Sequence, residues 1–218
     1  MMQAQRQTPI NPKGLSQQND NPFLLYLRNV IHSIPKNKIM KILKKILTFI
    51  GIFIGLIMIA AIFVKTDYSV EREIVINKSK QEVFEYVKLL KNQDNYSKWA
   101  RMDSRMKKEY TGTDGTVGFI SAWDSENKEL GRGEQEIKKI TEGERIDFQL
   151  RFFEPMASVS PAYMTTESVS ATQTKVKWGM SGTMAYPTNA VLLFMDISEI
   201  LGRDLTTGLT TLKKVLEK

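Results

Sequence analysis

The sequence predicts an α+β domain, built from an antiparallel β-sheet and a long C-terminal α-helix, and preceded by one transmembrane helix. Three observations predict this architecture. The nineteen residues from 46 to 64 carry no charge. Apolar and polar residues alternate with the period of a β-strand in several segments between residues 68 and 184. From about Thr188 onward, apolar residues recur with the period of an α-helix.

The apolar run 46–64 has the length of a membrane span. At about 1.5 Å per residue it covers about 28 Å, close to the thickness of a bilayer's hydrocarbon core. It is apolar on every side, whereas a helix packed in a soluble domain usually keeps a polar stripe. The sequence "IAAIFVK" at its end lacks the pair of small residues that marks a cleavable signal. We therefore predict an uncleaved signal-anchor helix over residues 40–65, in contact with lipid through residues 46–64.

The charge is distributed unevenly along the chain. The net charge is +7, yet residues 1–65 contain nine Lys or Arg and one acid, whereas residues 66–218 contain 22 basic and 23 acidic residues. Lysines cluster before the apolar run, which predicts a single-pass protein with a cytoplasmic N-terminus and an extracytoplasmic C-terminal domain. That domain has no excess positive charge with which to hold a phosphate backbone, so nucleic acid is excluded as a partner.

Residues 1–39 are open to two interpretations. Their start is rich in Gln, Asn and Pro, a composition typical of disorder. The sequence "NPFLLYLRNVIHSIP" that follows is compatible with a short helix, capped by Asn21 and with Pro22 at its first position. Alternatively, residues 1–39 are an upstream extension of the gene and translation starts at Met40, where "MKILKKIL" has the basic form of a signal-anchor start.

Residues 66–218 have the length of one domain. A strand is expected over residues 68–77, and the capping box "SKQE" then opens a helix. "KNQDNYSKWARMD" predicts a short second helix that brings Trp99 inward. Two further strands in "KKEYTGTDGTVGFISAW" are joined at Asp114 and Gly115, a strong hairpin signal.

The later segments "GRGEQEIKKI", "RIDFQLRF" and "KVKWGMSGTM" alternate between apolar and polar residues. This alternation predicts an antiparallel sheet with one covered face and one solvent-exposed face. Gly131 and Gly133 are expected on the covered face, where they leave room for a close-packed helix or a hollow. Glu134 and Glu136 are expected on the solvent-exposed face. In the C-terminal helix, Gly202 and Gly208 are poor helix formers, and they predict close packing against the sheet.

Several of these segments resemble the SRPBCC superfamily, which comprises START-like, polyketide cyclase/dehydrase and lipid-transport proteins. The matching phrases are "REIVINKSKQEVFEYV", "YTGTDGTVGFISAW", "GRGEQEIKKITEGERIDFQLRF", "TKVKWGMSG" and "GRDLTTGLTTLKKVLE". Residues 41–65 are similar to the bacterial branch that carries an N-terminal membrane helix. The resemblance implies a helix-grip fold, a curved antiparallel sheet wrapped around a long C-terminal helix with a hydrophobic cavity between them. It implies no fixed catalytic motif, because only some members act on the lipids, sterols, hormones or polyketides that they bind.

The scarcity of histidine and cysteine limits the kinds of catalytic and metal site that the chain can form. The one histidine, His32, precedes the apolar run, and the chain has no cysteine. The C-terminal domain therefore lacks Ser-His, Cys-His and imidazole–metal arrangements, and we predict no catalytic residue, no metal and no cofactor. The candidates for lining a cavity are aromatic residues, methionines, one glycine and one glutamine on the expected inward faces. They are Trp99, Trp123, Gly133, Gln135, Phe148, Trp178, Met180, Met184 and Met195.

Taken together, the sequence predicts a membrane-anchored domain that binds a hydrophobic small molecule or lipid. Two alternatives stay open at this point. One is an enzyme of the cyclase or dehydratase type that uses the same cavity, and the other is a protein-interaction module without a ligand. An apolar pocket selects its ligand by shape, so no motif identifies the ligand.

Overall fold

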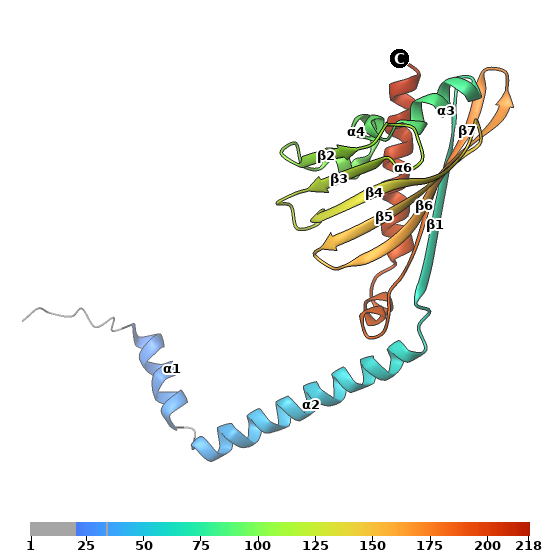
Figure 1. Cartoon of the computed structure of the whole chain (residues 1–218). Helices are drawn as coiled ribbons and strands as arrows, with labels where there is room; N and C mark the ends of the chain where they lie inside the picture. The colour runs from blue at the N-terminus through green and yellow to red at the C-terminus, as the bar shows by residue number, and fades with distance from the viewer. Residues whose placement is uncertain (1–20, 34) are drawn as a thin grey trace, which may run out of the picture. The chain divides into compact units, whose positions relative to one another are not determined.

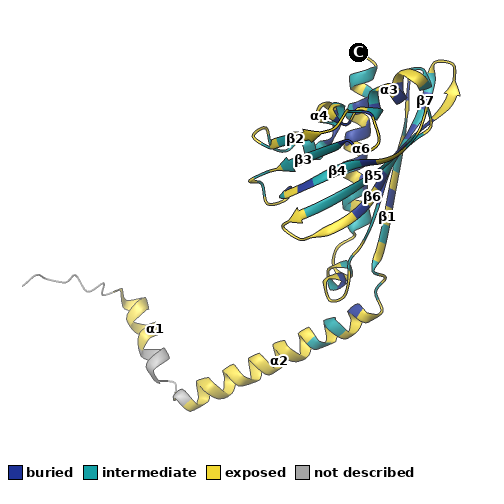
Figure 2. Cartoon of the chain, in the orientation of Figure 1, coloured by how far each residue is buried: buried dark blue, intermediate teal, exposed yellow. Residues whose placement is uncertain are grey.

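The computed structural model describes residues 21–33 and 35–218, and the chain divides into two compact units with a boundary after Gly55. The predicted short helix is present as α1 (Pro22–Ser33), and the Asn21 Oδ1 atom accepts a hydrogen bond from the Phe23 amide at 3.0 Å. Helix α2 (Lys36–Ile62) contains the apolar run up to Ile62, and its residues are mostly exposed (Figure 2). Among the described residues, Asn37–Ile62 is the one helix whose length and composition would allow it to cross a membrane.

The second unit is an α+β helix-grip domain, in which a seven-stranded antiparallel sheet packs on a long C-terminal helix (Figure 1). The strand order is β1-β7-β6-β5-β4-β3-β2, so the first strand pairs with the last. The strands are β1 (Asp67–Ile76), β2 (Lys107–Thr111), β3 (Ile120–Asp124), β4 (Arg132–Thr141), β5 (Arg145–Glu154), β6 (Ser158–Ser170) and β7 (Gln173–Thr183). Strand β6 has no counterpart in the sequence prediction.

Four short helices connect β1 to β2. They are α3 (Lys80–Lys88), the 3₁₀ helix η1 (Leu90–Asn92), α4 (Gln93–Tyr96) and α5 (Lys98–Arg101). The predicted cap is present, because the Ser79 hydroxyl accepts a hydrogen bond from the Glu82 amide at 3.3 Å. The Asp114 carboxylate, in the loop between β2 and β3, accepts hydrogen bonds from the amides of Leu90 at 2.8 Å and Lys91 at 3.2 Å. That loop therefore holds the start of η1 in place.

The C-terminal segment differs from the single helix that was predicted from Thr188. A 3₁₀ helix, η2 (Thr188–Leu193), comes first, and α6 (Ile197–Leu216) begins separately. Asp196 caps α6 by accepting a hydrogen bond from the Glu199 amide at 2.9 Å. A side chain that accepts this amide proton satisfies one of the free N–H groups of the first turn, so the helix starts here and not eight residues earlier.

The core lies between the sheet and α6. Buried leucines of α6 face buried aliphatic and aromatic side chains of the strands and of α3; the fully buried members include Ile76, Phe84, Ile137, Ile146, Phe148, Leu205, Leu209 and Leu212. The predicted close packing at the α6 glycines is confirmed, because a Cβ atom at Gly208 would lie 2.7 Å from Cζ3 of Trp178. Gly131, in contrast, is not in line with Gly133. It precedes β4 in a turn with φ +54°, a conformation that glycine adopts without strain.

Candidate ligand-binding cavity

A cavity of about 280 Å³ lies between the sheet, the α4–α5 segment and α6. Its wall is mostly apolar and includes Trp99, Ala100, Met106, Trp123, Leu130, Leu150, Phe152, Ala162, Trp178, Met180 and Leu201. Strands β3 to β7 supply the floor. Met106 before β2, Lys108 in β2, and Glu129 and Leu130 between β3 and β4 contribute to the rim. Small-molecule sites are concave and mostly apolar, with volumes of about 300–1,000 Å³, so the volume of this cavity is just below that range.

Aromatic rings form two clusters in the cavity wall. The ring of Trp178 lies edge-on to Trp99, with centroids 5.9 Å apart, and to the buried Tyr96 at 5.8 Å. The second cluster joins Trp123 and Phe152, whose centroids are 5.8 Å apart. The indole N–H of Trp123 donates a hydrogen bond to the Leu130 carbonyl at 3.2 Å, which fixes the ring in place. Both clusters offer flat apolar faces with defined geometry.

Five of the nine residues predicted from the sequence line this cavity, namely Trp99, Trp123, Gln135, Trp178 and Met180. The other four lie elsewhere. Phe148 is 2% exposed in the core, Met184 follows β7, and Met195 is 47% exposed after η2. Gly133 pairs with Trp123 across β3 and β4, and a Cβ atom at residue 133 would lie 2.5 Å from the Trp123 ring. The indole thus occupies the space that the sequence suggested was hollow.

Two polar residues that line the cavity, Ser121 and Gln135, share strand faces with apolar neighbours and were expected from the sequence to offer polar groups to a ligand. The Gln93 side chain also lines the cavity, and its buried Nε2 atom has no hydrogen-bond partner in the described chain. An unpaired buried donor is unfavourable, and a ligand oxygen or a water molecule would satisfy it. The sequence signal was weak, because Gln93 is one polar residue among many in "KNQDNYS".

Charged groups lie at one side of the cavity. Asp94 and Lys108 both line it and form an ion pair with each other. The Tyr110 hydroxyl donates a hydrogen bond to Asp94 at 3.1 Å. Burial, followed by the charge of Asp94, raises the pKa of Tyr110 to about 12. The phenol therefore keeps its proton at neutral pH, and Asp94 is engaged by two partners.

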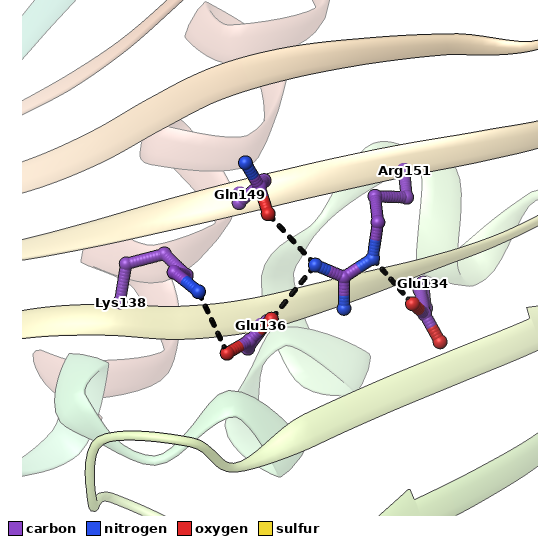
Figure 3. Close-up of polar contacts among 5 residues, drawn as sticks. All are labelled: Glu134, Glu136, Lys138, Gln149 and Arg151. Atoms are coloured by element: carbon purple, nitrogen blue, oxygen red, sulfur yellow. Dashed lines mark hydrogen bonds and ion pairs between the residues drawn. The ribbon is translucent and has the colours of Figure 1, made fainter.

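Glu134 and Glu136 flank the cavity-lining Gln135 along β4, so they lie on the face of the sheet opposite the cavity. Figure 3 shows both carboxylates beside Arg151. Arg151 donates hydrogen bonds to both carboxylates, at 2.7 Å to Glu136, and Lys138 donates to Glu136 at 3.0 Å. The hydrogen bonds from Arg151 and then Lys138 hold the pKa of Glu136 below its ordinary value. This pair of carboxylates is a cross-strand ion-pair network and has no access to a ligand in the cavity.

A second hollow of about 630 Å³ lies between the α4–α5 segment and the C-terminal end of α6. Its lining is polar or charged except for Val215, with Asp94, Asn95, Arg101, Thr211, Lys214 and Lys218 around it. It lacks the apolar walls that bind small molecules with affinity. The aromatic cavity is therefore the better candidate for a ligand site.

No protein-family model and no curated protein sequence matches the chain. Solved structures do match. A solution structure from Thermobifida fusca has a TM-score of 0.52 at 12% identity, covering 68% of this chain and 92% of the other. Norcoclaurine synthase from Thalictrum flavum, in complex with dopamine and hydroxybenzaldehyde, has a TM-score of 0.52 at 9% identity, covering 73% and 91%. A crystal structure from Chromobacterium violaceum has a TM-score of 0.50 at 12% identity, covering 69% and 97%. The structural neighbours are SRPBCC/Bet v1-like helix-grip proteins, and at these identities the likeness establishes the fold alone.

Proposed function

We propose that the protein binds a compact hydrophobic small molecule, or the apolar part of a lipid, in the aromatic cavity. The observation that carries this proposal is the open volume of about 280 Å³ with walls of tryptophan, phenylalanine, methionine and aliphatic side chains. A helix-grip domain with a filled interior would have no such space, so the cavity favours binding over an interaction module without a ligand. The norcoclaurine synthase structure, which holds two small aromatic molecules, supports the same size class of ligand.

The small volume of the cavity also restricts the size of the ligand. Burying apolar surface stabilises a complex by about 25 cal/mol per Å², and edge-to-face contact with aromatic rings adds about 0.5–1.5 kcal/mol per pair. The Trp99–Trp178 pair offers such a contact to a flat ring. Gln93 and Gln135 supply amide groups for one or two ligand oxygens. We therefore favour an aromatic or short-chain ligand with an oxygen substituent over a long acyl chain.

An enzyme of the cyclase or dehydratase type is the alternative use of the same cavity. Its acid–base chemistry would require a proton donor or acceptor among the charged lining residues Asp94, Lys108 and Glu129. Asp94 and Lys108 form an ion pair with each other, so each already has a charged partner at the cavity. This alternative would gain support from chemical conversion of a bound ligand, not from binding alone.

The protein is anchored to a membrane in this proposal, with residues 46–64, which include the C-terminal part of α2, as a single span. The lysine cluster before the span supports a cytoplasmic N-terminus and an extracytoplasmic domain at residues 66–218. A reporter enzyme that is active only outside the cytoplasm, fused after Lys218, should be active. Activity of a cytoplasmic reporter at the same position, with an inactive extracytoplasmic one, would overturn this orientation.

The binding proposal is tested by filling the cavity. Ala162 of β6 is 5% exposed and lines the cavity, whereas Val159 of the same strand is 55% exposed. The full-length protein is transferred from its native membrane into nanodiscs and analysed by native mass spectrometry, together with Ala162→Phe and Val159→Phe. Wild type and Val159→Phe should retain one small-molecule adduct, and Ala162→Phe should lose it. Equal adducts in all three proteins, or none in wild type, would contradict binding in this cavity.

A further inference from the structure

An uncharged loop between β7 and α6 exposes a set of large apolar side chains. We refer to residues 186–195, "YPTNAVLLFM", as the apolar loop. Five of its side chains are at least 40% exposed, led by Phe194 at 70%; the others are Tyr186, Val191, Leu193 and Met195. Exposed apolar side chains that are gathered in one short segment usually mark an interaction surface.

The apolar loop is attached to the last turn of α2 by a buried side chain. Asn189 is 1% exposed, and its Nδ2 atom donates hydrogen bonds to the carbonyls of Ala61 at 2.7 Å and Val64 at 3.4 Å. The last carbonyls of a helix have no partner within the helix, so Asn189 acts as a cap. Ala61 is fully buried in this contact, whereas the neighbouring Phe63 is 84% exposed.

The position of this contact along α2 indicates what the exposed face meets. Residues 46–64 are uncharged, and the first charged residues after them are Lys65 and Asp67. If residues 46–64 span a bilayer, Ala61 and Val64 lie where the hydrocarbon core gives way to the headgroups. The apolar loop, bonded to those carbonyls, lies at the same depth. Phe, Leu, Met and Tyr side chains are the types that stabilise segments in this boundary region.

We infer that the apolar loop inserts into the boundary between the headgroups and the acyl chains of the bilayer that α2 enters. The inference rests on the membrane anchoring proposed above. Contact with lipid explains why the segment exposes its apolar side chains and carries no charge. It also gives Asn189 a function, because fixing the loop to α2 holds the domain at a set depth against the membrane surface.

The chain contains no cysteine, so single labels can be introduced without removing any residue first. Three full-length variants are labelled with the environment-sensitive fluorophore NBD: Leu193→Cys in the apolar loop, Phe53→Cys in α2 and Val169→Cys near the β6–β7 turn. Val169 is a matched control, since it is an apolar residue with 53% exposure. Each protein is placed in phosphatidylcholine nanodiscs with or without nitroxide-labelled phosphatidylcholine. Iodide is the water-soluble quencher.

We expect the lipid-borne nitroxide to quench most of the emission from residues 193 and 53 and little of the emission from 169. Iodide should show the opposite pattern. Met195→Cys provides a second label in the apolar loop, in case Leu193→Cys perturbs it. Quenching of 193 and 195 by iodide, with 53 still quenched by lipid, would overturn the loop insertion and leave the anchoring intact. Protection of 193 from both quenchers would also overturn it, in favour of a covering protein. Iodide quenching of 53 would show that the anchoring itself fails.

Discussion

The indole of Trp178 lies against the backbone of Gly208, so close that a Cβ atom at residue 208 would be 2.7 Å from Cζ3 of the ring. Trp178 is 5% exposed and lines the cavity from β7, whereas Gly208 is in the middle of α6. This contact couples the packing of the long helix to the shape of the binding site. A glycine in a helix costs about 1 kcal/mol relative to alanine, and here its small size allows the tryptophan to pack.

The variant Gly208→Val should destabilise the domain by about 1–3 kcal/mol, because the added methyl groups displace the indole from its site. The exposed neighbour Thr207→Val is the matched control, since it introduces the same side chain on the outer side of α6. Chemical unfolding, monitored by circular dichroism, measures the free energy of unfolding of both variants. Equal stabilities of the two variants would show that the close approach is not required.

The aspartate in the β2–β3 loop should contribute to the stability of the cavity rim. Asp114 accepts hydrogen bonds from the Leu90 and Lys91 amides, so Asp114→Ala leaves two amide donors of η1 without that partner. We expect a loss of about 1–2 kcal/mol, as for the removal of a helix cap. Hydrogen exchange should also become faster at the amides of residues 90 and 91. Unchanged exchange there, compared with the exposed control Glu109→Ala, would contradict this role.

The ion-pair network on the outer face of the sheet predicts a pH dependence. Arg151 and Lys138 lower the pKa of Glu136, so the folded state holds this carboxylate ionised more strongly than the unfolded state does. The ionised Glu136 carboxylate contributes up to about 1 kcal/mol to the free energy of unfolding, as expected for a partly exposed pair. This contribution is fully present above the ordinary pKa of 4.5, and it is lost as the pH falls through the lowered pKa of the folded state.

The variant Glu136→Gln should therefore be less stable than wild type at pH 7, and the difference should shrink as the pH falls below about 4.5. Urea unfolding at pH 7, 5, 4 and 3 measures this. Glu109→Gln is the control for the loss of one carboxylate, because Glu109 is exposed and forms no ion pair in the described part of the chain. A Glu136→Gln difference that stays constant with pH would argue against the network.

Much of the fold could be predicted because its patterns are local. The alternation in "RIDFQLRF", the cap at Ser79 and the apolar run 46–64 each depend on neighbouring residues. Strand β6 was missed because its buried positions hold Ser160, Ala162 and Thr166 beside Met164, and Pro161 interrupts the segment. Small and polar inward residues do not produce the apolar alternation that identifies a strand.

The cavity could be predicted only in part, because its shape depends on contacts between distant segments. Trp99, Trp123 and Trp178 were expected to face inward and do so. The ring of Trp123 covers Gly133 only as a result of the β3–β4 register, and that register cannot be read from either strand alone. Met195 follows the helical period of the C-terminal segment, yet the cap at Asp196 starts α6 after it and leaves it exposed.

The central claim is that the aromatic cavity takes up an apolar molecule, and photolabelling tests it most directly. The full-length protein in phosphatidylcholine nanodiscs is irradiated with 3-trifluoromethyl-3-phenyldiazirine, a small apolar aromatic probe, and the labelled peptides are identified by mass spectrometry. We predict saturable labelling around Trp99, Met106 and Trp178, which Ala162→Phe abolishes and Val159→Phe preserves. Labelling of α2 alone, or cavity labelling that neither saturates nor responds to Ala162→Phe, would contradict the account.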